Sequence, residues 1–290
     1  VVLTPMLNER GRLIGDFTMC RIGPERFLLV GTYAAERFYQ RWFEARMGGF
    51  DVQVRACAME WLGFSVAGPA SRELLQSLVD EDLGTKAFPF MSFGAMDVGL
   101  VPALVGRLSF TGDLGYEIWV KNEYQRELYD RLVEAGKPLG LRHFGGRALN
   151  AMRMEKSFGS WAREYRPIYG PFEAGLDRFV DLTKPAFIGR EAALAEKTGG
   201  GERRLITLEI DATDCDAIAD EPIWLDGKVV GWVTSGAYGH SVGKSLALGY
   251  VDRASAQATT GFAVELIGDR RPAVRLTAPA FDPAGSRMRT

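Results

Sequence analysis

Short runs rich in apolar side chains, separated by polar turns, cover much of the first 120 residues. Such runs predict β-strands at 1–7 and 13–21, joined by the polar turn 8–12, and a third strand at 26–30. Further runs predict strands at 52–58 and 61–67. Residues 88–93 and 96–100 are short and aromatic-rich, and residues 103–110 lead into the segment 109–120. The chain therefore begins as a series of short strands.

Helical spacing separates several of these runs. Ala34, Phe38, Trp42 and Ala45 recur at intervals of four, four and three, which predicts a helix over 34–47 that ends at the glycine pair 48–49. Further helices are predicted from near Ser71, over 123–135 and 140–158, and from about 187 to 198. The order of strands and helices over 52–135 indicates a ferredoxin-like α+β unit.

The pattern changes to all β after Arg203. Apolar or alternating runs between turn signals predict strands at 205–210, 222–225, 228–235, 245–251 and 262–266. Five or six short strands indicate a small Greek-key barrel. The glycines at 199–201 suit a linker, because no strand precedes them at the spacing of a nucleotide fingerprint. We therefore expect an α+β region over 1–200 and a C-terminal β-barrel domain over 201–290.

Composition and charge exclude several classes of protein. The 290 residues are 47% hydrophobic and 25% charged, and 35 basic residues against 37 acidic ones lack the basic excess of a nucleic-acid binder. No apolar run approaches the roughly 20 residues that span a bilayer. We expect a cytoplasmic protein without nucleic-acid or membrane partners.

Metal and disulfide chemistry find little support in the residue types present. Cys20, Cys57 and Cys215 are isolated and odd in number, and His143 and His240 are the only histidines. These counts argue against a disulfide framework and against a multi-histidine metal centre, so no metal site is predicted. His240 is expected to be a loop residue.

The segment SFTGDLGYEIWV, residues 109–120, carries the most informative carboxylate. A tight turn over 111–115 precedes a strand in which Tyr116, Ile118 and Val120 alternate with Glu117 and Trp119. Burying an unpaired carboxylate costs several kcal/mol, roughly, so Glu117 requires a partner or solvent. A solvent-exposed position, an arginine partner and a bound ligand all remain open.

Three further segments accompany it: RGRLIGDFTM with Asp16, RALNAMRMEKSFG with Arg153 and Glu155, and the turn-rich AREYRPIYGPFEAGL. Together with SFTGDLGYEIWV, these make the sequence resemble the glycine-cleavage T-protein family, most closely the folate-binding portion of the dimethylglycine and sarcosine dehydrogenases. The resemblance runs from PMLNERGRLIGDF to FDPAGSRMR. It implies the T-protein-like folate-binding fold followed by the small C-terminal barrel. Since the chain opens on a strand without an initiator Met, we expect a fragment or processed product.

The resemblance also implies the site residues. Asp16 occupies the position of the catalytic carboxylate beside the folate amines, and Glu117 would accept hydrogen bonds from the pterin 2-amino group and ring N–H. The other residues expected to bind folate are Arg153, Phe110, Tyr116 and Tyr169.

Some of these residues have alternative interpretations. Arg153 is as well suited to a structural ion pair, with Glu117 as one candidate partner. Tyr169, like Trp161 and Tyr165, suits either a hydrophobic core or a flat pocket. Glu155 is expected to bind backbone amides in the loop that follows it. Phe110 stands where many relatives carry Tyr.

The function implied is tetrahydrofolate-dependent one-carbon transfer, in the folate-binding part of a dimethylglycine/sarcosine dehydrogenase-like oxidative demethylase. The expected donor is the imine made from an N-methylglycine, supplied by an attached or separate flavoprotein segment. No flavin is expected in this chain, which has no GxGxxG element. The alternatives are a stand-alone glycine-cleavage aminomethyltransferase, a folate-dependent O- or S-demethylase, and a non-catalytic folate-binding module. The presence of Asp16 favours an enzyme.

Overall fold

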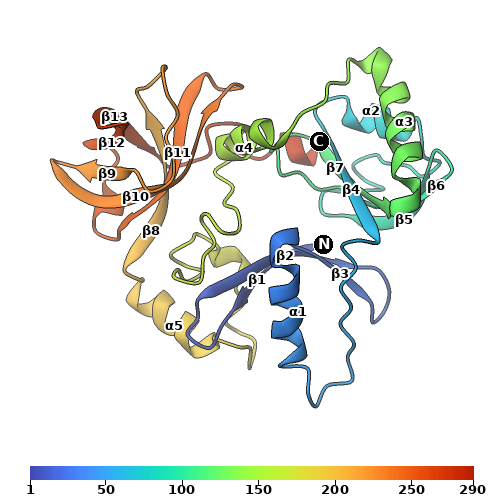
Figure 1. Ribbon diagram of the computed structural model, residues 1–290, viewed down its shortest axis with the longest axis horizontal. Coiled ribbons are helices and arrows are strands. Elements are labelled where there is room, and N and C mark those ends of the chain that lie inside the picture. Colours follow the sequence, from blue (N-terminus) through green and yellow to red (C-terminus); the bar gives the residue numbers. More distant parts are fainter.

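The computed structural model describes all 290 residues and shows three lobes arranged around a shared centre (Figure 1). The first lobe is a three-stranded antiparallel sheet with a helix packed on it, and its strand order is β1-β2-β3. Its elements are β1 (Val2–Leu7), β2 (Leu13–Arg21), β3 (Phe27–Val30), the 3-10 turn η1 (Tyr33–Ala35) and α1 (Glu36–Glu44). No helix of the chain is long and apolar enough to cross a membrane.

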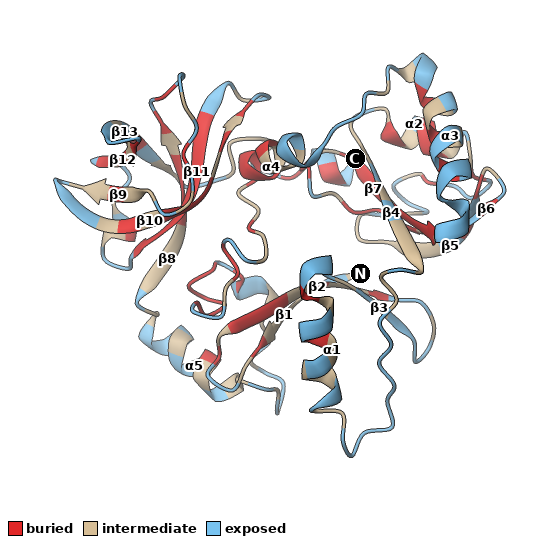
Figure 2. Ribbon diagram, viewed as in Figure 1, coloured by how far each residue is buried: buried red, intermediate tan, exposed pale blue.

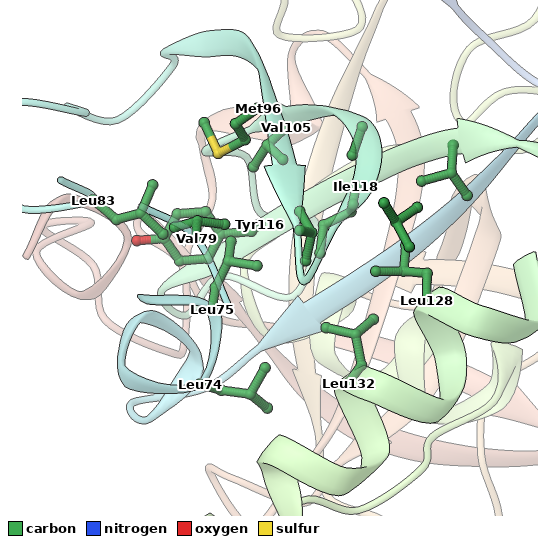
Figure 3. Packing of buried hydrophobic residues seen from close by; sticks show 14 of the residues in the cluster. Leu74, Leu75, Val79, Leu83, Met96, Val105, Tyr116, Ile118, Leu128 and Leu132 are labelled. Atoms are coloured by element: carbon green, nitrogen blue, oxygen red, sulfur yellow. The ribbon is translucent and has the colours of Figure 1, made fainter. Parts of the chain in front are cut away.

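The second lobe is a four-stranded antiparallel sheet in the order β4-β7-β6-β5, with two helices on one face. Its elements are β4 (Trp61–Ala67), α2 (Ser71–Gln76), β5 (Phe93–Val98), β6 (Val101–Gly106), β7 (Gly115–Lys121), the 3-10 turns η2 (Asn122–Tyr124) and η3 (Lys137–Leu139), and α3 (Gln125–Gly136). Tyr116, Ile118 and Val120 of β7 are buried against α2 and α3 (Figure 3). Each such apolar side chain contributes about 1.5–3 kcal/mol on burial.

This lobe differs in detail from the ferredoxin-like unit expected over 52–135. A ferredoxin-like unit runs βαββαβ, whereas here the order is βαβββα and β4 pairs antiparallel with β7. Residues 52–58, which alternate in the sequence, form no strand because no neighbouring strand pairs with them.

The third lobe is a closed barrel of six antiparallel strands in the order β10-β11-β8-β13-β12-β9. Its strands are β8 (Arg203–Ile210), β9 (Pro222–Leu225), β10 (Lys228–Gly239), β11 (Lys244–Asp252), β12 (Phe262–Leu266) and β13 (Asp269–Leu276). The short 3-10 turns η4 (Asp177–Phe179), η5 (Ser255–Gln257) and η6 (Arg287–Arg289) complete the chain. The predicted fold class, an α+β region followed by a small β-barrel, is confirmed.

Two helices connect the lobes. α4 (Gly146–Glu155) lies between the barrel and the second lobe, and α5 (Arg190–Gly199) leads into the barrel (Figure 1). Ala151 and Met154 of α4 pack on barrel residues, so the C-terminal half of this helix is buried (Figure 2). α4 is shorter than the predicted 140–158, because Gly140 adopts a left-handed conformation with φ 73° and Gly145 is extended.

The turn before β7 requires a glycine at position 112. Gly112 has φ 85°, and a Cβ there would overlap the side chain of Lys156, which is buried beside Asp282. We expect Gly112→Ala to lower the free energy of unfolding by about 1–3 kcal/mol, measured by urea denaturation. Gly146→Ala is the matched control, since a Cβ at this helical position meets no atom within 4 Å. Equal stability of the two variants would contradict this account of the turn.

Candidate functional site

Asp16 lies in the middle of β2 and has no salt-bridge partner. Burial raises the pKa of its carboxyl group to about 7, against a smaller opposing effect of a hydrogen bond from its own backbone amide. The phenols of Tyr39 and Tyr165 lie close enough to Asp16 to be affected by its charge. Burial is the larger cause of the raised pKa of each phenol, and the Asp16 charge raises both pKa values further. The carboxyl group can therefore exchange a proton near neutral pH.

Glu117 lies on β7, on the face of the sheet opposite α2 and α3. Its cross-strand neighbours are Ser65 on β4 and Gly106 on β6, and the rings of Phe93 and Trp119 lie on the same face of the sheet. No arginine or lysine pairs with it, and burial alone raises its pKa to about 7. Of the three interpretations offered by the sequence, an arginine partner is therefore wrong, and the half-buried position disfavours the fully solvated one.

Cys20 shows that β2 and Glu117 lie close together. Burial raises the pKa of the Cys20 thiol to about 11, and the Glu117 charge adds to this increase. Asp16 and Cys20 share a face of β2 and lie about 13 Å apart at roughly 3.3 Å per residue. The surface that runs from Asp16 past Cys20 toward Glu117 is a strip between β2 and β7.

Arg153 projects from α4 into a fully bonded, buried network. It is 3% exposed, and its Nη1 atom lies 2.9 Å from Oε2 of Glu164, which is 0% exposed. Arg153 also donates to the carbonyl oxygen of Phe158 at 2.7 Å, to Oδ1 of Asn150 at 3.0 Å and to Oγ of Ser235 at 2.7 Å. The ion pair considered from the sequence is present, but its partner is Glu164 rather than Glu117.

The aromatic candidates lie in three different surroundings. Phe110 is partly exposed and stacks on Phe158 with ring centroids 6.1 Å apart. Tyr116 is fully buried in the core of the second lobe, on the face opposite Glu117, because adjacent strand residues point to opposite faces. Tyr169 is buried and stacks on Tyr250, with 3.5 Å between the ring centroids. Its phenol oxygen accepts a hydrogen bond of 3.1 Å from Nε1 of Trp232. Only Phe110 combines an exposed ring with a position next to the turn before β7.

Two buried carboxylates of the AREYRPIYGPFEAGL segment were not singled out in the sequence. Glu164 accepts hydrogen bonds from Arg153, from the amide of Ser160 at 2.9 Å and from Thr234 at 2.6 Å. Glu173 accepts from Arg12 at 3.0 Å and from the amides of residues 170, 202 and 203. The signal that could have identified both carboxylates in the sequence is an acidic residue in a loop otherwise rich in aromatic residues and proline.

Glu155 has a structural role, although its partner differs from the expected one. Its Oε1 atom accepts a hydrogen bond of 2.7 Å from the amide of Ser241, in the barrel, and not from the loop after α4. Glu155 therefore connects α4 to the hairpin between β10 and β11. No group of three His, Cys, Asp or Glu side chains is placed to hold a metal ion.

Two protein-family models match the chain. The GCVT N-terminal domain matches residues 1–184, and the glycine cleavage T-protein C-terminal barrel domain matches residues 203–282. The crystal structure of the glycine cleavage system aminomethyltransferase T from Bartonella henselae has a TM-score of 0.86 at 24% identity, covering 97% of this chain and 76% of that one. This similarity shows the fold.

Curated relatives fall into two groups. The mitochondrial dimethylglycine dehydrogenase of Mus musculus is 39% identical over 291 residues, which are 99% of this chain and 34% of the relative. The aminomethyltransferase of Desulfitobacterium hafniense (strain Y51) is 31% identical over 254 residues, 88% of this chain and 69% of the relative. The chain therefore spans about a third of the length of the dehydrogenase.

Proposed function

Because the chain belongs to the glycine-cleavage T-protein family, we propose that it performs tetrahydrofolate-dependent one-carbon transfer at the strip between Asp16 and Glu117. One observation carries the proposal. Two half-buried carboxyl groups, each without a cationic partner and each with a pKa raised to about 7, lie on β2 and β7, and the Glu117 charge reaches Cys20 of β2. Such groups are characteristic of sites where burial is offset by a ligand.

Glu117 would hold the pterin. Its carboxylate can accept two parallel hydrogen bonds from the pterin 2-amino group and ring N–H, and bonds to a charged acceptor are stronger than neutral ones. Phe93 and Trp119, whose rings lie on the same face of the sheet, are candidate walls for a flat ring bound at Glu117. The partly exposed ring of Phe110 is a candidate wall for the same ligand.

Asp16 would act on the amine. Tetrahydrofolate supplies the nucleophilic nitrogen that takes up the one-carbon unit when it is bound. Asp16, with its pKa at about 7, can accept a proton from that amine near neutral pH, and its carboxylate can stabilise positive charge that develops beside it. We assign Arg153, Tyr116 and Tyr169 supporting roles, because their polar atoms are bonded within the protein or their rings are in the core.

The finer proposal is that the donor is an imine derived from an N-methylglycine, and that a flavoprotein segment, attached or separate, produces it. Its support is the match to dimethylglycine dehydrogenase over 99% of this chain. The match to the aminomethyltransferase supports the second candidate, transfer of an aminomethyl group without oxidation. Product formation from each donor in parallel assays distinguishes the two.

Glu117→Gln tests the ligand site directly. We expect the variant to bind tetrahydrofolate about 10-fold or more weakly, since a hydrogen bond to a charged group contributes about 1.5–3 kcal/mol. Anaerobic isothermal titration calorimetry measures the affinity, with Glu123→Gln, a change at an exposed carboxylate beyond the same strand, as control. Unchanged affinity in Glu117→Gln would exclude Glu117 from the site. A wild-type chain that is folded but binds no tetrahydrofolate would refute the proposal for this chain.

The pH dependence follows from the same carboxyl group. The pterin requires ionised Glu117, whose pKa in the free protein is raised to about 7 by burial. Affinity should therefore fall as the pH is lowered from 8 to 6, and binding near pH 6.5 should release a proton. Calorimetry in two buffers with different heats of ionisation measures that proton, and the Glu117→Gln variant should release less.

A further inference from the structure

A groove of about 540 Å³ runs along β4, away from the face that carries Glu117, and lies within the size range of ligand pockets. Residues 63–71 form one wall, and α3 with residues 139–144 forms the other. Figure 3 shows Leu132 of α3 and Leu74 of α2 beside the β4 strand. Phe64, Val66 and Leu139 add to its apolar lining.

β4 is an edge strand, because it pairs with β7 alone. The amide of Gly68 donates to Leu114, and the amide of Asn122 donates to the carbonyl of Glu60, so residues 60 and 68 direct their backbone groups toward β7. Orientation alternates along an antiparallel strand. The odd-numbered residues Gly63, Ser65 and Ala67 therefore direct their N–H and C=O groups outward, and all three line the groove.

Basic residues line the groove, and acidic residues do not. Its lining contains Arg142 and His143 and no aspartate or glutamate. The His143 ring is held by Tyr129, with 3.1 Å between Nε2 and the phenol oxygen. The groove thus combines outward-facing backbone groups, an apolar floor and the positive charge of Arg142.

We propose that this groove binds an extended, acidic peptide segment, which adds to the sheet as a strand beside β4. Backbone hydrogen bonds to residues 63, 65 and 67 would set its register, alternate apolar side chains would fill the floor, and a carboxylate would pair with Arg142. Strand addition at a free sheet edge is a recurring mode of peptide recognition. A groove between an edge strand and a helix limits the peptide to one extended chain.

The probe is a fluorescein-labelled eight-residue peptide in which valine alternates with aspartate or threonine, titrated against the full chain by fluorescence anisotropy. We expect saturable binding, with at least about 10-fold weaker binding when alternate peptide amides are N-methylated. A peptide with lysine in place of aspartate, and the Arg142→Gln variant, should each bind about 5-fold or more weakly at low salt. No binding by the aspartate peptide, or equal binding by the N-methylated one, would overturn the proposal.

Two further measurements locate the peptide. Hydrogen–deuterium exchange should show slower exchange of the Gly63, Ser65 and Ala67 amides when peptide is added, and unchanged exchange there would also overturn the proposal. Ala67→Pro removes one outward N–H from an edge strand, where proline is tolerated, and should weaken peptide binding about 5-fold or more. The N-methylated peptide makes the same test on the unaltered protein if this variant does not fold.

Discussion

Asp16→Asn is expected to slow one-carbon transfer by about 10²–10⁴-fold while tetrahydrofolate affinity changes only a few-fold. The amide keeps the shape of the carboxyl group but neither accepts a proton nor stabilises positive charge. The measurement is the single-turnover rate of methylenetetrahydrofolate formation, with the imine generated in the reaction by an added N-methylglycine-oxidising flavoprotein. Asp97→Asn, an exposed change on β5, is the control.

The pH dependence of the rate separates this role from a purely structural one. Burial raises the pKa of Asp16 to about 7, so the wild-type rate at saturating ligand should rise as the pH increases through 7. Asp16→Asn should lose that rise, whereas Glu117→Gln should retain it once the ligand concentration compensates for weaker binding. An unchanged rate in Asp16→Asn would remove Asp16 from the mechanism, and a loss of affinity as large as the loss of rate would place it in binding instead.

Arg153→Met is expected to lower the free energy of unfolding by about 3–5 kcal/mol, because it leaves the fully buried Glu164 carboxylate without its cation. Urea denaturation measures the change. Arg126→Met is the matched control: its guanidinium is 93% exposed in an ion pair with Asp130, and its loss should cost no more than about 0.5 kcal/mol.

The double variant Arg153→Met/Glu164→Gln should recover part of the lost stability, because the second change removes the unpaired charge. It also separates the two interpretations of Arg153. If tetrahydrofolate affinity returns to the wild-type value with stability, Arg153 acts through the ion pair alone. Affinity that stays low at recovered stability would indicate contact with the ligand. Equal stability of Arg153→Met and the wild type would contradict the structural ion pair.

Local pattern predicted much of the secondary structure. The apolar or alternating runs of residues 13–21, 222–225 and 262–266 predict β2, β9 and β12 with the observed bounds. The same two-residue period places Tyr116 and Glu117 on opposite faces of β7, as the structure shows. Side chains alternate on any strand, so this information is present in a few consecutive residues. The alternation over 52–58 predicts a strand that the structure does not contain, because a strand also needs a neighbouring strand with which to pair.

The sequence by itself thus determined most of the strands and helices, the α+β and barrel classes, and Asp16 and Glu117 as candidates through their resemblance to a family. Tertiary structure decided which groups the polar side chains contact. Arg153 forms its ion pair with Glu164, Glu155 accepts a hydrogen bond from the barrel amide of Ser241, and Glu117 has no cationic partner. It also placed Glu117 of the second lobe near Cys20 of β2, the strand that carries Asp16. The physical reason is that an ion pair, a pKa or a shared site depends on distance and burial, and the packing of the lobes sets both.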